Sequence, residues 1–88
     1  MRRAARTDAT QAAIVAALRK IGCEVQDLSR MGNGVPDLMA KLRFRIMWLE
    51  VKSPGGKLTP HQVDWHLRWS PHVAVVTTPE EAIEVMVK

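Results

Sequence analysis

Apolar residues recur at helical spacing in the first part of the chain. Ile14, Leu18 and Ile21 lie within an alanine-rich stretch and fall on one side of a helix. This pattern predicts an amphipathic helix over about residues 8–21. Asp8 is a plausible N-cap, because its carboxylate can accept hydrogen bonds from the free backbone N–H groups of the first turn.

Runs of β-branched and bulky apolar residues predict the strands. The run Ile46-Met47-Trp48-Leu49 has the character of a buried strand and is too apolar for an open edge strand. The segment before it, Leu42-Arg43-Phe44-Arg45, lacks the Gly or Asn that a two-residue hairpin prefers. The strands are expected at residues 23–26, 37–42, 45–52 and 72–77.

Helix-start signals predict two further helices. Thr59-Pro60-His61-Gln62 combines an N-cap threonine, a proline in the first turn and a glutamine at the capping-box position. Val63 and Leu67 are expected to face the core from this helix, and Thr78-Pro79-Glu80-Glu81 begins a short final helix. The order αβββαβα predicts an α/β fold in which helices cover both faces of a mixed sheet.

Length and composition indicate one small domain over residues 1–88, of which residues 1–6 are expected to be a flexible basic arm. The 88 residues are 47% hydrophobic and 25% charged, as in globular domains, and so small a domain is often stable only as an oligomer. No apolar run is long enough to span a bilayer, and the single cysteine, Cys23, cannot form an internal disulfide. The expected location is the cytoplasm.

Basic residues are concentrated toward the start of the chain. Residues 1–57 contain 11 Lys or Arg against 5 Asp or Glu, a net charge of +6, whereas residues 58–88 contain 2 against 4, a net charge of −2. A polyanion such as nucleic acid is the natural partner of such a surface. A solvated basic face explains the charge equally well.

Candidate chemistry lies in the pattern P-D-(x12)-E-x-K, formed by Asp37, Glu50 and Lys52. Side chains alternate along a strand, so Glu50 and Lys52 project to one side with the Val51 carbonyl between them. If Asp37 joins them from the preceding strand, two carboxylates and a carbonyl form an oxygen site suited to Mg²⁺ or Mn²⁺. The chemistry this suggests is metal-assisted phosphodiester hydrolysis. A simpler interpretation makes Asp37 a turn residue and Glu50 and Lys52 a solvated charge pair.

The motifs G-x-P-D-L (34–38), L-E-V-K (49–52) and P-G-G-K-L-T (54–59), together with Gln62, resemble the VRR-NUC domain. That family belongs to the PD-(D/E)xK nucleases, which share the fold of restriction endonucleases and are similar to Holliday-junction resolvases. Members that consist of this domain alone are often phage-encoded and similar to dimeric junction-cleaving enzymes. The resemblance therefore implies DNA as the substrate, a homodimer, and the host cytoplasm as the location.

The resemblance also implies roles for individual residues. Asp37 and Glu50 would bind the metal, Lys52 would orient or deprotonate the attacking water or stabilise phosphate charge, and Gln62 would buttress the site. The capping box explains Gln62 without any chemistry, and both roles are compatible. The family usually has a glutamate where this chain has Gln11, a poorer metal ligand, so a second metal is in doubt. Asp8, one turn earlier, could compensate.

Other side chains are candidates for contact surfaces. His66 lies one turn from Gln62 and could border the site or be a structural histidine. Trp65 and Trp69 lie outside the Val63 and Leu67 face, which favours a dimer interface slightly over packing against the final helix. Phosphate contacts are expected from the basic residues near the motifs, with a solvated rim as the alternative: Arg30, Lys41, Arg43, Arg45 and Lys57.

The sequence hypothesis is a Mg²⁺- or Mn²⁺-dependent endonuclease that cuts four-way DNA junctions as a homodimer. One alternative is a non-specific DNase or one that cuts flaps or duplex. Another is a catalytically silent nuclease fold that only binds nucleic acid, which the Gln11 substitution makes conceivable.

Overall fold

The structure of the chain is a computed structural model that describes residues 2–88, with side chains from Ala9 onward. Its elements follow the order αβββαβα, as the sequence predicts. They are α1 (Arg2–Lys20), β1 (Glu24–Asp27), β2 (Leu38–Leu42), β3 (Arg45–Val51), α2 (Pro60–Trp69), β4 (Val73–Val76) and α3 (Pro79–Val87). Among the residues described, no helix has both the length and the apolar character needed to cross a membrane.

Helix α1 is longer than its apolar spacing predicts. It begins at Arg2 rather than at Asp8, because the residues upstream include alanines and arginines, which favour helix. Ile14 and Leu18 are fully buried, whereas Ile21 is 38% exposed beyond the end of the helix. The Asp8 side chain lies outside the described side chains, and the flexibility expected of residues 1–6 stays a prediction.

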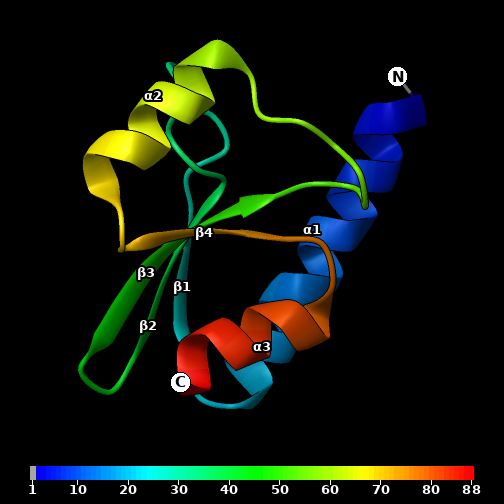
Figure 1. Cartoon of the computed structure of the whole chain (residues 1–88). Coiled ribbons are helices and arrows are strands. Elements are labelled where there is room, and N and C mark those ends of the chain that lie inside the picture. Colours follow the sequence, from blue (N-terminus) through cyan, green and yellow to red (C-terminus); the bar gives the residue numbers. More distant parts are fainter. Residues whose placement is uncertain (1) are drawn as a thin grey trace.

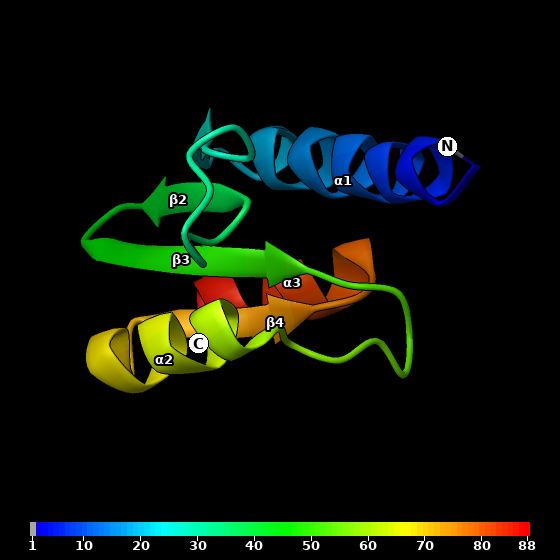
Figure 2. The same cartoon turned by 90° about the horizontal axis from the view of Figure 1, so that it is seen from above.

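The four strands form one mixed sheet in the order β1-β2-β3-β4. Strands β1 and β2 are antiparallel, as are β2 and β3, whereas β3 and β4 are parallel. Strand β3 therefore lies inside the sheet between β2 and β4 (Figure 2). Its apolar run agrees with this position, because an inner strand is covered on both faces.

Helices cover the two faces of the sheet unequally (Figure 1): α1 and α3 lie on one face and α2 on the other. Alternation along β3 divides its side chains, so Met47, Leu49 and Val51 enter the main core under α1 and α3. Trp48 and Glu50 point to the face that carries α2. The sheet thus separates an apolar core from a face that holds buried polar groups.

Helix α2 packs through a different stripe from the one predicted. Val63 and Leu67 are 43% and 75% exposed, so their assignment to the core is wrong. Trp65 is buried instead, and its ring lies 5.9 Å from Trp48 and 4.8 Å from Trp69. The tryptophans form a cluster between α2 and β3 in which Trp65 is buried and Trp69 is 40% exposed. They pack neither against the final helix nor, for Trp65, toward solvent, and a dimer interface at this surface stays a prediction. The larger rings take the inner side because they fill the gap above the sheet.

The β2–β3 connection is a two-residue hairpin despite its unfavourable sequence. Leu42 pairs with Arg45, which leaves Arg43 and Phe44 as the loop. Arg43 adopts φ 55°, in the left-handed region where Gly or Asn is usual.

Candidate active site

The site begins where β2 starts and β3 ends. Pro36 is fully buried, and Asp37 follows it at the edge of β2. The Val51 N–H donates to Asp37 Oδ2 at 2.8 Å, which ties the carboxylate to the last residue of β3. Because the N–H and C=O of one strand residue point to the same side, the Val51 carbonyl is directed toward the Asp37 side as well.

Glu50 is the buried charge of this site. It is only 2% exposed, and its Oε2 accepts a hydrogen bond from Gln62 Nε2 at 3.2 Å. Its Oε1 is buried and has no hydrogen-bond partner among the described residues. Burial, followed by the close approach and negative charge of the Asp37 carboxylate, raises the pKa of Glu50 to about 8, while Lys52 acts in the opposite direction. Asp37 and Glu50 therefore meet at one point, as the motif predicts.

Lys52 is placed beside the two carboxylates. Its Nζ lies 3.9 Å from Glu50 Oε2, and its side chain is 19% exposed. His66, one turn after Gln62 on α2, borders the same region. Burial, and then the positive charge of Lys52, lowers the pKa of His66, and its Nε2 is buried without a partner within the described part of the chain. The neutral imidazole adds no positive charge next to Lys52.

Gln62 makes both contacts that the sequence allowed. Its Oε1 accepts from the Thr59 N–H at 2.9 Å, and its own N–H donates to Thr59 Oγ1 at 3.3 Å, which completes the capping box. Its Nε2 remains free to donate to Glu50. One amide therefore both starts helix α2 and holds a carboxylate oxygen of the site.

A glycine positions this helix against the loop before Asp37. Gly34 adopts φ +82°, and a Cβ at this position would overlap the His61 carbonyl in the first turn of α2. The absence of a side chain lets the loop lie directly on that turn. Gly34 belongs to the G-x-P-D motif, but the contact with His61, far along the sequence, gave no pattern by which it could be predicted.

The donor set fits a divalent cation. Two carboxylates in contact, one with an unpartnered buried oxygen and a raised pKa, form a place where a cation would remove the repulsion between them. Asp37, Glu50 and the Val51 carbonyl are the groups that would hold it. Among the described residues, no cluster of three or more His, Cys, Asp or Glu side chains is placed to hold a metal ion.

Gln11 is directed elsewhere. Its Nε2 donates to Asp27 Oδ2 at 3.2 Å, on the α1 side of the sheet. Asp27 also accepts from the Ser29 hydroxyl and N–H, and these two bonds lower its pKa. The role of Asp27, at the end of β1, as the partner of Gln11 and Ser29 was not predicted from the sequence. The turn pattern D-x-S was the available signal, because Asp commonly bonds the backbone two residues on.

The basic residues expected to bind phosphate fall into separate groups. Arg30 and Lys57 lie in the loops that precede β2 and follow β3, at the edge that carries Asp37 and Glu50. Arg43 and Arg45 lie at the opposite end of these strands, in and beside the hairpin loop. Lys41 is exposed on β2, close to the hairpin and opposite Glu24 of β1.

Comparison with solved structures finds a chain described as a "VRR_NUC domain". The two structures superpose with a TM-score of 0.75 at 30% sequence identity, over 89% of this chain and 90% of that chain. A scan of protein-family models and a search of curated proteins find no match. The similarity covers nearly the whole of both chains at 30% sequence identity. The chain therefore belongs to the VRR-NUC family.

Proposed function

We propose that the protein is a divalent-metal-dependent endonuclease that hydrolyses phosphodiester bonds in DNA. Membership of a family of nuclease domains supports the class of reaction. The observation that carries the proposal is the convergence of Asp37 and Glu50 at neighbouring strand ends, with Lys52 Nζ 3.9 Å from Glu50 Oε2. Burying the Glu50 carboxyl beside a second carboxylate costs folding energy, so its retention points to a cationic ligand.

Each residue has a distinct part in the proposed reaction. A bound Mg²⁺ or Mn²⁺ would polarise a phosphate oxygen and lower the pKa of a coordinated water. Asp37, Glu50 and the Val51 carbonyl hold the cation. Gln62 Nε2 fixes Glu50 Oε2, which leaves Oε1 available to the cation. Lys52 Nζ orients the attacking water or balances charge on the scissile phosphate.

The proposed substrate is a four-way DNA junction cut by a homodimer. A two-fold pair of domains presents two sites, which matches a junction with two equivalent strands. The net charge of +6 in residues 1–57 favours a substrate that displays several phosphates at once. The cytoplasm is the proposed location.

The experiment is cleavage of four-way junctions, plain duplex and single strands with Mg²⁺ or Mn²⁺, against matched reactions in EDTA. Asp37→Ala and Lys52→Ala should each lower the cleavage rate by at least about a hundredfold while DNA binding persists, because the first removes a ligand of the cation and the second removes a positive charge beside the reacting phosphate. Asp64→Ala is the matched control. This carboxylate is exposed and paired with Arg68 on α2, so its loss should leave the rate unchanged.

The same assay decides between the alternatives. Cleavage of every DNA at equal rates would identify a non-specific DNase, and binding without cleavage would identify a silent nuclease fold. Full activity in Asp37→Ala would remove the proposed metal site. The mass in solution, compared with 9.9 kDa for one chain, tests the homodimer.

A further inference from the structure

The apex of the β2–β3 hairpin carries an aromatic ring that the fold does not use. Phe44 is the single phenylalanine of the chain, and its side chain is fully exposed. Arginines flank it on both sides, Arg43 in the loop and Arg45 at the start of β3. An exposed aromatic ring between two cations is an arrangement that burial or core packing does not account for.

The backbone conformation of the hairpin loop is also unfavourable for the residue that adopts it. Arg43 adopts φ 55°, a left-handed conformation that is strained for a residue with a Cβ and is not strained for glycine. Glycine or asparagine would close the same hairpin without this strain. An arginine in this position keeps a positive charge at the apex at the expense of stability.

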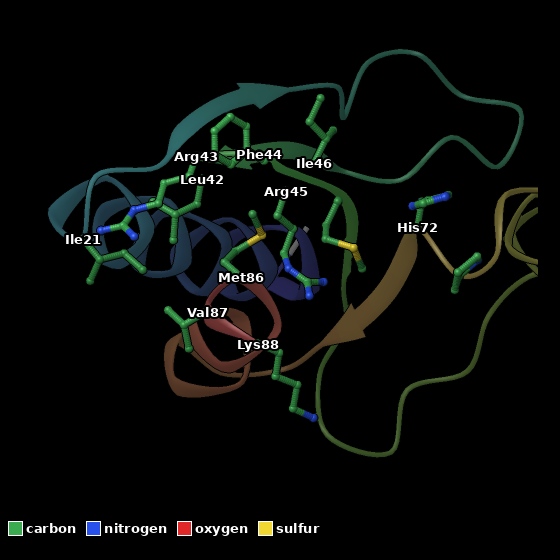
Figure 3. Close-up of a pocket in the computed structure, with 12 residues that line it drawn as sticks. Ile21, Leu42, Arg43, Phe44, Arg45, Ile46, His72, Met86, Val87 and Lys88 are labelled. Atoms are coloured by element: carbon green, nitrogen blue, oxygen red, sulfur yellow. The ribbon is translucent and has the colours of Figure 1, made fainter.

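A broad hollow of about 910 Å³ opens beside the hairpin (Figure 3). Its apolar lining comes from the hairpin, the residue after α1 and the end of α3, and its cationic lining comes from three side chains. No carboxylate side chain lines it in the part of the chain that the structure describes. The lining includes Ile21, Leu42, Val87, Arg43, Arg45 and Lys88.

This combination matches the chemistry of a nucleic acid strand. Guanidinium groups bind phosphates, and an exposed ring offers a stacking platform for a base. We propose that the hairpin apex is a second DNA contact, in which Phe44 stacks on an unpaired base while Arg43 and Arg45 bind the flanking phosphates. That DNA is the ligand rests on the proposed function.

The second contact is separate from the metal site. Along β3, Arg45 and Glu50 lie about 17 Å apart, at about 3.4 Å per strand residue. A single phosphate therefore cannot contact the hairpin and the metal site at once. Unpaired bases occur at flaps, gaps and frayed ends, and a four-way junction presents one where a base pair at its branch point opens, so the contact would select such substrates over continuous duplex.

The test measures binding in EDTA, so that no cleavage occurs and a failure of the proposed reaction does not affect it. The probe is branched DNA with 2-aminopurine at an unpaired position, because stacking on an aromatic ring quenches its fluorescence. Phe44→Leu keeps an apolar side chain without a ring, and Phe44→Tyr keeps the ring. Leucine should abolish the quenching and weaken binding by between about 5-fold and about 150-fold, whereas tyrosine should preserve both.

The arginine arm of the test uses Arg43→Gln, with Arg68→Gln as the control from an exposed site on α2. Loss of Arg43 should lower the slope of log affinity against log salt by about 0.7 to 0.9, and loss of Arg68 should not change it. An unquenched wild-type complex, or unchanged affinity and quenching in Phe44→Leu, would overturn the proposal. A fall in the solution mass of Phe44→Leu would also overturn it, because the apex would then contact a second copy of the chain.

Discussion

Glu50 shows how one buried residue can make stability depend on pH. Its folded-state pKa of about 8 exceeds the ordinary value of 4.5, so the folded protein binds this proton more tightly than the unfolded chain does. The stability associated with the proton is fully present below pH 4.5 and is lost as the pH rises through 8. At higher pH the ionised Glu50 faces Asp37 in a buried place.

We therefore expect metal-free protein to lose stability between pH 5 and pH 9 by an amount on the order of a few kcal/mol, measured by urea unfolding in EDTA. Glu50→Gln keeps the shape without the charge and should lose less over the same range. Mg²⁺ or Mn²⁺ should restore wild-type stability at the high end, because the cation binds only the folded state. Equal pH dependence in wild type and Glu50→Gln would contradict this assignment.

Gln62 offers a way to separate a structural role from a role in the site. Gln62→Glu keeps an oxygen acceptor for the Thr59 N–H but replaces the donor to Glu50 with a like charge. We expect helix α2 to retain its cap while cleavage falls, because the carboxylate pair gains a third negative neighbour.

Gln62→Ala removes both contacts and should cost about 0.5–2 kcal/mol of stability in addition. Thermal unfolding at acidic pH, where the carboxyl groups are protonated, and cleavage by each variant are the measurements. If Gln62→Glu cleaves DNA at the wild-type rate, the amide serves only as a cap.

At the scale of elements, the loop before Asp37 and the first turn of α2 depend on each other. Gly34 and Gly32 both adopt positive φ, so alanine is strained at either position. An added Cβ at Gly32 would meet open space, whereas at Gly34 it would meet the His61 backbone. The two glycines form a matched pair that differs in this one contact.

Gly34→Ala should therefore destabilise the protein by at least about 1 kcal/mol more than Gly32→Ala, as judged by denaturant midpoints. It should also lower cleavage, because the displaced helix carries Gln62 away from Glu50. Similar losses in both variants would mean that the strain of the left-handed backbone, and not the contact, explains this glycine.

Helix α2 provides a second test, because its inner face is not the one that apolar spacing predicts. Trp65→Ala should cost about 3–5 kcal/mol, since it empties the space beneath the helix that Trp48 and Trp69 share. Leu67→Ala is the control: this side chain is 75% exposed, and its loss should change stability by less than about 0.5 kcal/mol. Both losses are measured by urea unfolding. A larger loss in Leu67→Ala than in Trp65→Ala would mean that Val63 and Leu67, and not Trp65, face the sheet.

At the scale of the whole molecule, the sheet separates stability from chemistry. The main core lies under α1 and α3, and Asp37, Glu50, Lys52 and Gln62 gather on the side that α2 covers. Substitutions in the site can therefore change charge and ligand binding without opening the main core. The hairpin lies at the far end of the same strands, so the two proposed DNA contacts are separate.

Local signals in the sequence were enough to predict much of this protein. These signals predicted the element order, the capping box at Thr59 and the projection of Glu50 and Lys52 to the same side. Each depends on short-range periodicity or backbone hydrogen bonding, which neighbouring residues largely determine. The P-D and E-x-K motifs indicated a shared site because adjacent strands bring their ends together. The VRR-NUC resemblance was also readable from these motifs.

Tertiary packing decided the remaining features. Which side of α2 faces the sheet depended on three tryptophan rings from β3 and α2 filling one space, which helical spacing alone cannot predict. Three other features also depend on residues far apart in the sequence. They are the hydrogen bond from Gln11 to Asp27, the close contact of Gly34 with His61, and the buried, unpartnered oxygen of Glu50. Such contacts form only once the sheet has brought distant segments together, because they join residues that are not neighbours along the chain.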